Sequence, residues 1–193
     1  SSAASDVYKR QWEFHVVEGE SHFLEQQICD GLVDVGLFPT PIYSQDLESY
    51  PVLDEQILLA ISVENKKAIA IADSLMTGDG IREIAPFGAF PFILLREGLK
   101  LRTLVNRLCQ AECFVPKAVI GSETLDSCRS LVEDDYGITF LPSTLNSKGD
   151  DDKVKFYPLA SKLCFRQLVL VARSDRAKRF HLSEVAHIMQ QFL

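Results

Sequence analysis

The sequence predicts an α/β protein built from two lobes, each a mostly parallel sheet with helices on its faces. Short β-branched and aliphatic runs alternate along the chain with amphipathic stretches at helical spacing, an order typical of parallel sheets. This alternating unit occurs twice, on either side of a polar stretch at residues 73–80. Two apolar runs, at residues 56–63 and 154–159, are placed to cross between the units.

The first unit begins with an expected strand at residues 14–17 and a helix that starts at Ser21. Leu24 and Ile28 lie on the buried stripe of this helix, and Gly31 ends it where a left-handed residue is easiest. Apolar runs then predict three further strands, near residues 32–38, 50–53 and 56–63.

The second unit repeats the pattern. Leu101, Leu104, Val105 and Leu108 have the spacing of a helix with one buried face, and Ser122 is expected to begin the next helix. The strands of this unit are predicted at residues 92–95, 118–120 and 137–141, and they are followed by strands at 154–159 and 166–173 and by a C-terminal helix.

Composition and charge exclude several classes of protein. The chain has 193 residues, of which 47% are hydrophobic, and this is enough for a sizeable core. Its 20 basic and 27 acidic residues give a net charge of −7, so the chain is a poor nucleic-acid binder on its own. No apolar run approaches the ~18 residues of a membrane span. Five scattered cysteines favour reduced thiols in the cytoplasm. We therefore expect a cytoplasmic protein with no membrane partner.

Residues 1–11 are expected to lie outside the fold. Residues 6–11 look like the translated end of a transposon used to build sequencing libraries, so we interpret 1–11 as a non-native leader. The rest of the chain then divides into a first lobe of residues 12–63 plus 154–193 and a second lobe of residues 64–153.

The sequence offers no convincing catalytic, metal or cofactor site. Its four histidines do not accompany a nucleophile motif. Cys109 and Cys113 lack a second pair at zinc spacing, and the acidic run at 150–152 lacks the glycine and distal glutamate of a calcium loop. We expect no enzyme activity, no metal and no cofactor, and we leave a redox role for the cysteines open.

Three strand-to-helix turns share an arrangement suited to ligand binding. They lie at residues 19–21, 96–98 and 121–124. In a parallel sheet such turns sit at the carboxyl ends of the strands, where helix N-termini offer free N–H groups to anions and hydroxyls. Two lobes that face one another across these edges would enclose a cleft for a small molecule.

Two motifs resemble the effector-binding domain of LysR-type transcriptional regulators. Residues 18–21, Glu-Gly-Glu-Ser, followed by a helix and by the run DGLVDVGL at 30–37, are similar to the family's E-G-x-S turn, helix and G-x-(L/V)-D-x-(A/G) pattern. The helix that leads into Asp135-Tyr136-Gly137 and then Leu141-Pro142 is similar to the second signature, V-x-x-G-x-G-I-x-x-x-P. The similarity covers residues 12–193.

The sequence also departs from the family pattern. Asp135 replaces the first of two usual glycines, which is tolerable because only one position needs a left-handed backbone. Nothing matches the family's N-terminal winged helix-turn-helix, and the first strand and helix of the sensing domain, which normally precede Trp12, are also expected to be missing.

The resemblance implies a two-lobed type 2 periplasmic-binding-protein-like fold, with two crossover strands, that binds a small effector between its lobes. Arg96 would balance a carboxylate, whereas the acidic Glu20 beside it favours an amine, so the implied effector is a carboxylate or an amino-acid-like metabolite. Intact relatives act as homodimers or tetramers, and they contact DNA only through the N-terminal domain. Carried over by position, the effector-binding residues are Glu20, Ser21, Pro39, Thr40, Arg96, Gly98, Ser122 and Phe140.

Three functions are compatible with such a fold. The first is a non-enzymatic sensor domain separated from its DNA reader. The second is the solute-binding protein of a transporter, which would need an export signal. The third is an enzyme of the dehydratase type, for which the sequence shows no matching threonine-arginine motif.

Overall fold

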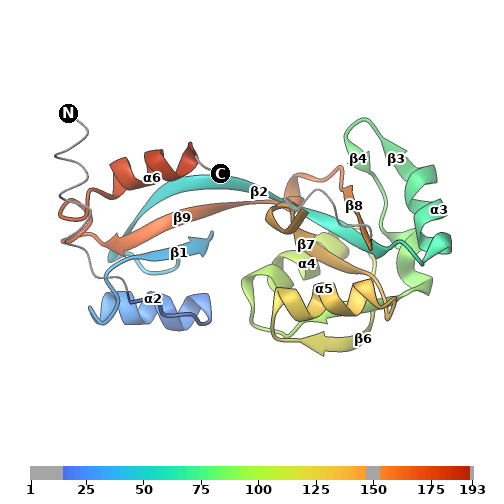
Figure 1. Ribbon diagram of the computed structural model, residues 1–193, viewed down its shortest axis with the longest axis horizontal. Helices are drawn as coiled ribbons and strands as arrows, with labels where there is room; N and C mark the ends of the chain where they lie inside the picture. Colours follow the sequence, from blue (N-terminus) through green and yellow to red (C-terminus); the bar gives the residue numbers. More distant parts are fainter. Residues whose placement is uncertain (1–14, 147–152, 192–193) are drawn as a thin grey trace.

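The computed structural model describes residues 15–146 and 153–191, and it shows two lobes joined by a long strand (Figure 1). This strand, β2 (Leu47–Ser62), pairs with β9 (Phe165–Arg173) through its first part and with strands of the second lobe through its last part. One continuous backbone therefore connects the two hydrophobic cores.

The first lobe is a three-stranded sheet between two helices. Its strand order is β1-β9-β2, where β1 spans Gly36–Pro39, and both ladders are antiparallel. Figure 1 shows α2 (Ser21–Cys29) and α6 (Leu182–Gln190) on opposite faces of this sheet. Val169 and Val171 pack with Ile28 of α2, whereas Leu170 packs with Ala186 of α6. Side chains of β9 alternate between two buried faces, which explains its unbroken apolar sequence.

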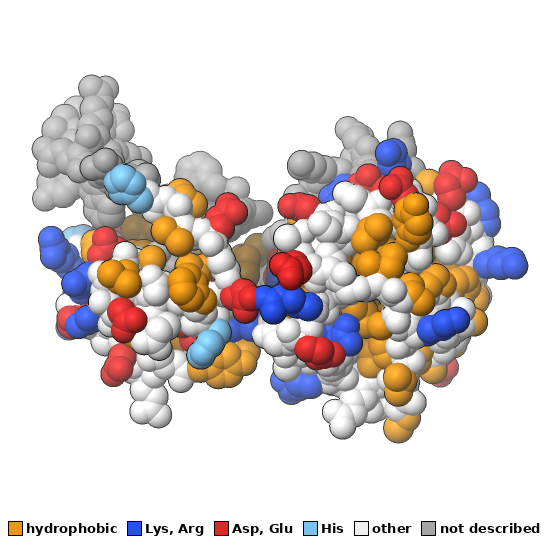
Figure 2. All heavy atoms as spheres, turned by 90° about the horizontal axis from the view of Figure 1, so that it is seen from below, with side chains coloured by type: hydrophobic (Ala, Val, Ile, Leu, Met, Phe, Trp, Pro, Cys, Tyr) orange, Lys and Arg blue, Asp and Glu red, His pale blue; other side chains and the backbone are white. Residues whose placement is uncertain are grey.

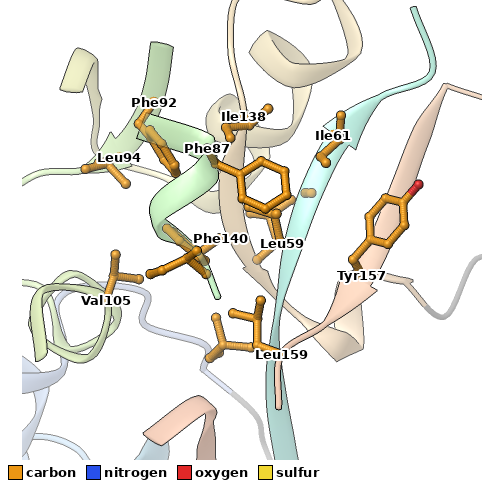
Figure 3. Packing of buried hydrophobic residues seen from close by; sticks show 14 of the residues in the cluster. Leu59, Ile61, Phe87, Phe92, Leu94, Val105, Ile138, Phe140, Tyr157 and Leu159 are labelled. Atoms are coloured by element: carbon orange, nitrogen blue, oxygen red, sulfur yellow. The ribbon is translucent and has the colours of Figure 1, made fainter. Parts of the chain in front are cut away.

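The second lobe contains most of the buried hydrophobic residues. Phe92 of β5 (Pro91–Leu95) is fully buried, and its ring stacks on Phe140 of β7 (Thr139–Pro142) with the ring centroids 5.7 Å apart. Figure 3 shows these rings together with Phe87 and with side chains of β2 and β8 (Val154–Pro158). The first lobe has only small clusters on either side of its sheet, so the second lobe dominates the hydrophobic stabilisation of the chain.

Helices and short elements enclose this second core. The helices are α3 (Lys66–Leu75), α4 (Lys100–Ala111) and α5 (Leu125–Glu133). The predicted parallel pairing is confirmed in this lobe, because β5 pairs in parallel with β6 (Lys117–Ser122) and Phe92 forms a parallel bridge to Ile138. The first lobe differs from the prediction of a mostly parallel sheet, because both of its described ladders are antiparallel. The short elements are β3 (Met76–Thr77), β4 (Gly80–Ile81) and the 3₁₀ turns η1 (Ala85–Ala89), η2 (Ser143–Asn146) and η3 (Lys162–Cys164).

The crossings between the lobes differ in detail from the prediction. The two strands expected near 50–53 and 56–63 are one strand, with a bulge between Pro51 and Leu53 that leaves Val52 as the extra residue. Proline has no N–H for the ladder, so a bulge accommodates it. Strand β8 and residues 57–62 of β2 pair within the second lobe, and the chain returns to the first lobe between β8 and β9. The division into residues 12–63 plus 154–193 and residues 64–153 stays a prediction.

Local predictions near the helix starts were partly wrong. Residues 15–17 form no strand, and Val16 and Val17 are exposed. Glu20 precedes α2 as its N-cap, and Thr124 rather than Ser122 caps α5, because the Thr124 hydroxyl accepts a hydrogen bond from the Ser127 N–H. The expected leader at 1–11 lies outside the described residues.

Helix α3 was not predicted. Its sequence signal is short: Asn65 caps it by accepting from the Ala68 N–H, and Ala68 and Ala72 form the buried face at a spacing of one turn. These small side chains add little hydrophobicity, so periodicity alone does not distinguish the segment from a loop. Within the described residues, no helix has both the length and the apolar character that a membrane crossing requires.

The Asp135-Gly137 turn shows how the unusual family motif is accommodated. Gly31 is left-handed as predicted, and Asp135 takes the left-handed conformation with φ of 56°. The Asp135 side chain accepts a hydrogen bond from Asn65. Gly137 serves a different purpose, because a Cβ on it would lie 2.6 Å from the carbonyl oxygen of Pro91. This contact between backbones requires glycine.

We expect Gly137→Ala to lower the free energy of unfolding by about 1–3 kcal/mol. The added methyl group would collide with the Pro91 carbonyl and push β5 away from the turn that contains residue 137. Urea denaturation followed by circular dichroism measures this change. Gly121→Ala is the matched control, since its Cβ would meet nothing within 4 Å. Equal transition midpoints for the two variants would contradict the close approach at Gly137.

Candidate functional site

The two lobes meet at an exposed ion pair between Arg96 and Glu20. Arg96 follows β5 in the second lobe, and Glu20 stands at the start of α2 in the first. Their side chains are 43% and 49% exposed, so water screens much of this attraction. Figure 2 shows acidic and basic side chains meeting where the lobes approach one another.

A second ion pair between the lobes is buried. Lys100, the first residue of α4, places its Nζ 2.7 Å from Glu25 Oε1 in α2, and the two side chains are only 9% and 4% exposed. The same ammonium donates to the Pro39 carbonyl at 3.0 Å. It also lies 5.8 Å and 5.4 Å from the ring centroids of Phe38 and Tyr43. Every one of these partners belongs to the first lobe, so Lys100 links the lobes across their contact.

Glu25 is held in place for this pairing. Its second carboxylate oxygen accepts a hydrogen bond from the Tyr43 N–H at 3.1 Å. A buried carboxylate is tolerated only when it is paired and hydrogen-bonded, and both conditions are met here. The loop after β1 and the helix α2 are therefore fixed around one cation from the opposite lobe.

Lys100 also borders two cavities. A small one of about 70 Å³ is lined by Glu20, Ser21 and Gly98, among others, and a larger one of about 400 Å³ is lined by Thr40 and by residues of α4 and η3. Both cavities are bordered by Lys100, Tyr43 and Thr103. In this closed arrangement the small cavity is too small for a metabolite.

Comparison with known proteins identifies the family. The sequence pattern of the LysR substrate binding domain matches residues 9–193. The chain belongs to the LysR substrate binding domain family. The match begins inside the segment that we interpreted as a leader, at residue 9.

Curated relatives of this LysR-family domain are longer proteins, which match it over about half of their own length. It is 28% identical over 173 residues to an uncharacterized HTH-type transcriptional regulator, YcgK of Bacillus subtilis, covering 85% of this chain and 53% of the relative. It is 23% identical over 175 residues to the hydrogen peroxide-inducible genes activator of Haemophilus influenzae, covering 90% of this chain and 55% of that protein. The chain thus spans about half the length of these relatives.

Solved structures of similar shape confirm the two-lobed fold. The Corynebacterium glutamicum OxyR C206 mutant aligns with a TM-score of 0.73 at 20% identity, covering 98% of this chain and 57% of that one. The reduced form of OxyR from N. meningitidis aligns with a TM-score of 0.72 at 19% identity, covering 94% of this chain and 81% of that one. The predicted type 2 periplasmic-binding-protein-like fold is therefore confirmed.

The structure brings most of the predicted effector-binding residues to the contact between the lobes. Glu20, Ser21 and Gly98 line the small cavity, and Arg96 pairs with Glu20. Gly98 has a φ of 92°, which its lack of a side chain permits. The roles of these residues in binding stay a prediction.

The other predicted residues lie in different surroundings. The Pro39 carbonyl accepts the hydrogen bond from Lys100, and Thr40 lines the larger cavity. Ser122 is buried, and its carbonyl accepts the Arg96 N–H at 2.8 Å, so it supports the turn that carries Arg96. Phe140 is 3% exposed, stacks on Phe92 in the core of the second lobe and lines neither of these two cavities.

Sequence reasoning missed Lys100, Glu25 and Tyr43. Glu25 occurs in an ordinary helical pattern, and its burial depends on the opposite lobe. Lys100 did carry a signal, because a cation in the first turn of a helix is opposed by the helix dipole. A lysine at that position therefore indicates a specific anionic partner.

The chemistry of the cysteines is restrained by burial. Cys109, Cys128 and Cys164 are buried, and all five cysteines are free. Burial first, and the negative charge of Glu112 second, raise the pKa of Cys109 from 9.0 to about 11 and that of Cys164 from 9.0 to about 12. These thiols stay protonated at neutral pH and are weak nucleophiles. Within residues 15–146 and 153–191, no three His, Cys, Asp or Glu side chains are grouped to hold a metal.

We expect Cys109 and Cys164 to react slowly with a thiol reagent at pH 8. The pKa of Cys109 is two units above its ordinary value, so its thiolate fraction is roughly 100-fold lower than that of a free cysteine. Labelling of the native and the urea-unfolded chain, located by mass spectrometry, measures the rates. The exposed Cys113 is the internal reference, and Cys113→Ser should remove the fast phase. Fast labelling of Cys109 in the native chain would contradict its burial.

We expect Lys100→Met to lower the free energy of unfolding by roughly 3 kcal/mol, because it leaves the Glu25 carboxylate buried without its cation. The double variant Lys100→Met with Glu25→Leu should recover most of this loss, which chemical denaturation of all four chains in a double-mutant cycle would show. Lys117→Met, at an exposed position of β6, is the control and should change little. Additive effects of the two substitutions would argue against a direct interaction.

Proposed function

We propose that this chain is the small-molecule-sensing domain of a transcriptional regulator whose DNA-binding part is a separate domain. Membership of the LysR substrate binding domain family supports this function over a transporter protein or an enzyme. The curated relatives are transcriptional regulators, and the net charge of −7 is unsuited to DNA binding by this chain itself. The regulator would act in the cytoplasm as a homodimer or tetramer, without catalysis.

The contact between Arg96 and Glu20 carries the proposal for the effector. Breaking an exposed ion pair costs little free energy, so a ligand can replace the contact between these two side chains when the lobes part. Separation of the pair leaves the Arg96 cation on one lobe and the Glu20 anion on the facing lobe, both available to a ligand. A ligand with both a carboxylate and an ammonium group satisfies both, the carboxylate through a two-pronged contact with the guanidinium. An amino-acid-like metabolite therefore fits this site better than a simple carboxylate, which would face the negative charge of Glu20.

Binding would act by changing the relation between the lobes. The closed arrangement leaves only about 70 Å³ beside Glu20 and Ser21, so the effector must bind a more open form. A ligand that prefers one of two arrangements shifts the population toward it. The Lys100–Glu25 pair sets the free energy of that opening, since it is the buried link between the lobes.

Sensing of peroxide by thiols is a second possibility, suggested by the name of the Haemophilus relative. Four of the five cysteines of this chain, all except the exposed Cys113, argue against it. Those that are buried have raised pKa values, and the half-buried Cys29 donates its S–H to the Ser44 hydroxyl. A peroxide sensor needs an accessible thiolate of low pKa.

The proposed function is tested by a thermal-shift screen of amino acids and related metabolites. We expect at least one zwitterionic compound to raise the melting temperature without being consumed. Arg96→Gln and Glu20→Gln should each weaken its binding about 10-fold to 100-fold, because a charge-assisted hydrogen bond is lost. Arg179→Gln, at an exposed position far along the sequence, is the control and should bind as the unmodified chain does. Turnover of the compound, or stabilisation only by compounds without an ammonium group, would overturn the proposal.

A further inference from the structure

Strand β2 changes its pairing partner at the point where it crosses between the lobes. Glu55 and Gln56 pair with β9 in the ladder of the first lobe, whereas Ile57 pairs with Pro142 of β7 in the second lobe. Figure 1 shows β2 and β9 running side by side out of the first lobe toward the second. A rotation of one lobe against the other is therefore concentrated at this change of partner, where a few residues absorb the change in backbone angles.

The 3₁₀ turn η2, which follows β7, contacts this crossing point through two consecutive hydroxyl groups. The Ser143 hydroxyl accepts a hydrogen bond from the Gln56 N–H at 3.2 Å. The Thr144 hydroxyl donates to Glu55 Oε1 at 2.5 Å. The Gln56 side chain extends the contact, because its amide nitrogen donates at 3.3 Å to the carbonyl of Leu159, in the segment where the chain returns to the first lobe. Both crossings between the lobes are thus joined at one level.

The two sides of this contact are anchored in different lobes. Arg166 Nε lies 2.5 Å from Glu55 Oε2, and the two residues are paired across the β2–β9 ladder, so the first lobe holds the carboxylate. The second lobe holds η2, because Arg129 of α5 donates to the Leu145 carbonyl at 2.7 Å. The bond between Thr144 and Glu55 therefore connects one lobe directly to the other.

Burial gives this contact its weight. The side chain of Glu55 is only 2% exposed, so water cannot replace the Thr144 hydroxyl while the lobes stay in place. A buried carboxylate oxygen that loses its partner costs far more free energy than an exposed one. The arrangement that keeps Thr144 beside Glu55 is therefore favoured over arrangements that separate them.

We propose that Ser143 and Thr144 of η2 form a clamp on Glu55 and Gln56 that sets the resting angle between the lobes. The ion pair of Glu55 with Arg166 lies within one ladder, so it moves with the first lobe and persists at every angle. The two hydroxyl contacts exist only near the closed angle. Opening breaks them and lets water reach the Glu55 carboxylate.

The clamp goes beyond the proposed function, because it acts without any ligand. It lies at the crossing strands, whereas the buried Lys100–Glu25 pair lies where the surfaces of the lobes face one another. A ligand that prefers a more open form would have to release both contacts. The resting angle is measured on the chain alone, so the result does not depend on whether an effector is found.

Distances between the lobes test the clamp in the full chain. Spin labels are attached at Lys67→Cys in α3 of the second lobe and at Arg179→Cys in the first lobe, both at exposed positions. Cys29→Ser and Cys113→Ser first remove the accessible thiols, and the other three cysteines are buried. Pulsed electron paramagnetic resonance then gives the distribution of distances between the two labels.

Variants of the clamp should change this distribution. Thr144→Val removes the hydroxyl at nearly the same volume, and we expect a second population of distances to appear. The ratio of open to closed chains should rise about tenfold, because a hydrogen bond to a charged group is lost. Ser143→Ala should act in the same direction. Thr144→Ser keeps a hydroxyl and should give the distribution of the unmodified chain.

Thr77→Val is the matched control. The Thr77 hydroxyl donates to the Gly80 carbonyl at 2.6 Å within the second lobe, so its loss should lower the melting temperature and leave the distances unchanged. Unchanged distances in both clamp variants, or an equal change in the control, would overturn the proposal. A lower melting temperature of the clamp variants without a change in distance would assign the hydroxyls a purely stabilising role and would also overturn it.

Discussion

The ammonium of Lys100 is the point on which the relation between the two lobes depends. It leaves the start of α4, crosses to the first lobe and is enclosed there by Glu25, the Pro39 carbonyl and two aromatic rings. A buried ammonium is stable only when its charge is paired and its N–H groups are hydrogen-bonded. These contacts therefore favour one relative placement of the two lobes, although the lobes have separate hydrophobic cores. Any ligand that moves the lobes apart must break these contacts as well as the exposed Arg96–Glu20 pair.

The same side chain gives the space between the lobes its organisation. Lys100 borders the small cavity with Glu20 and Ser21 and also the larger basic cavity. The first holds a cation and an anion that neutralise one another, whereas the second holds positive charge in excess.

Strand β2 is the covalent connection that joins the two lobes beside this contact. Sixteen residues run from the sheet of the first lobe into the core of the second without a turn. The bulge at Val52 lies within the part that pairs with β9, and it increases the local twist of the strand. The covalent connection is therefore a continuous ladder, and the ion pairs at the facing surfaces determine how far the lobes can part around it.

The sequence by itself determined the fold class, the family and most elements. Apolar runs such as ILLAISV and LVLVA mark buried strands, and the spacing of Leu101, Val105 and Leu108 marks the buried face of α4. These signals are local, because burial of one face imposes a period of two or of 3.6 residues on any chain. The glycine at residue 31 and the turn at Asp135 were likewise determined locally, by the backbone conformation that each must adopt.

Only the tertiary structure decided which charged residues meet. Helix α3 was missed because its buried alanines add little hydrophobicity to the sequence pattern, and only the structure shows that the ring of Phe140, a predicted site residue, stacks on Phe92 in the core. Glu25 and Lys100 are 75 positions apart, and nothing in the neighbourhood of either shows that the other will neutralise it. Electrostatic pairing depends on distance in space and on exclusion of water, and both quantities exist only once the two lobes have come together.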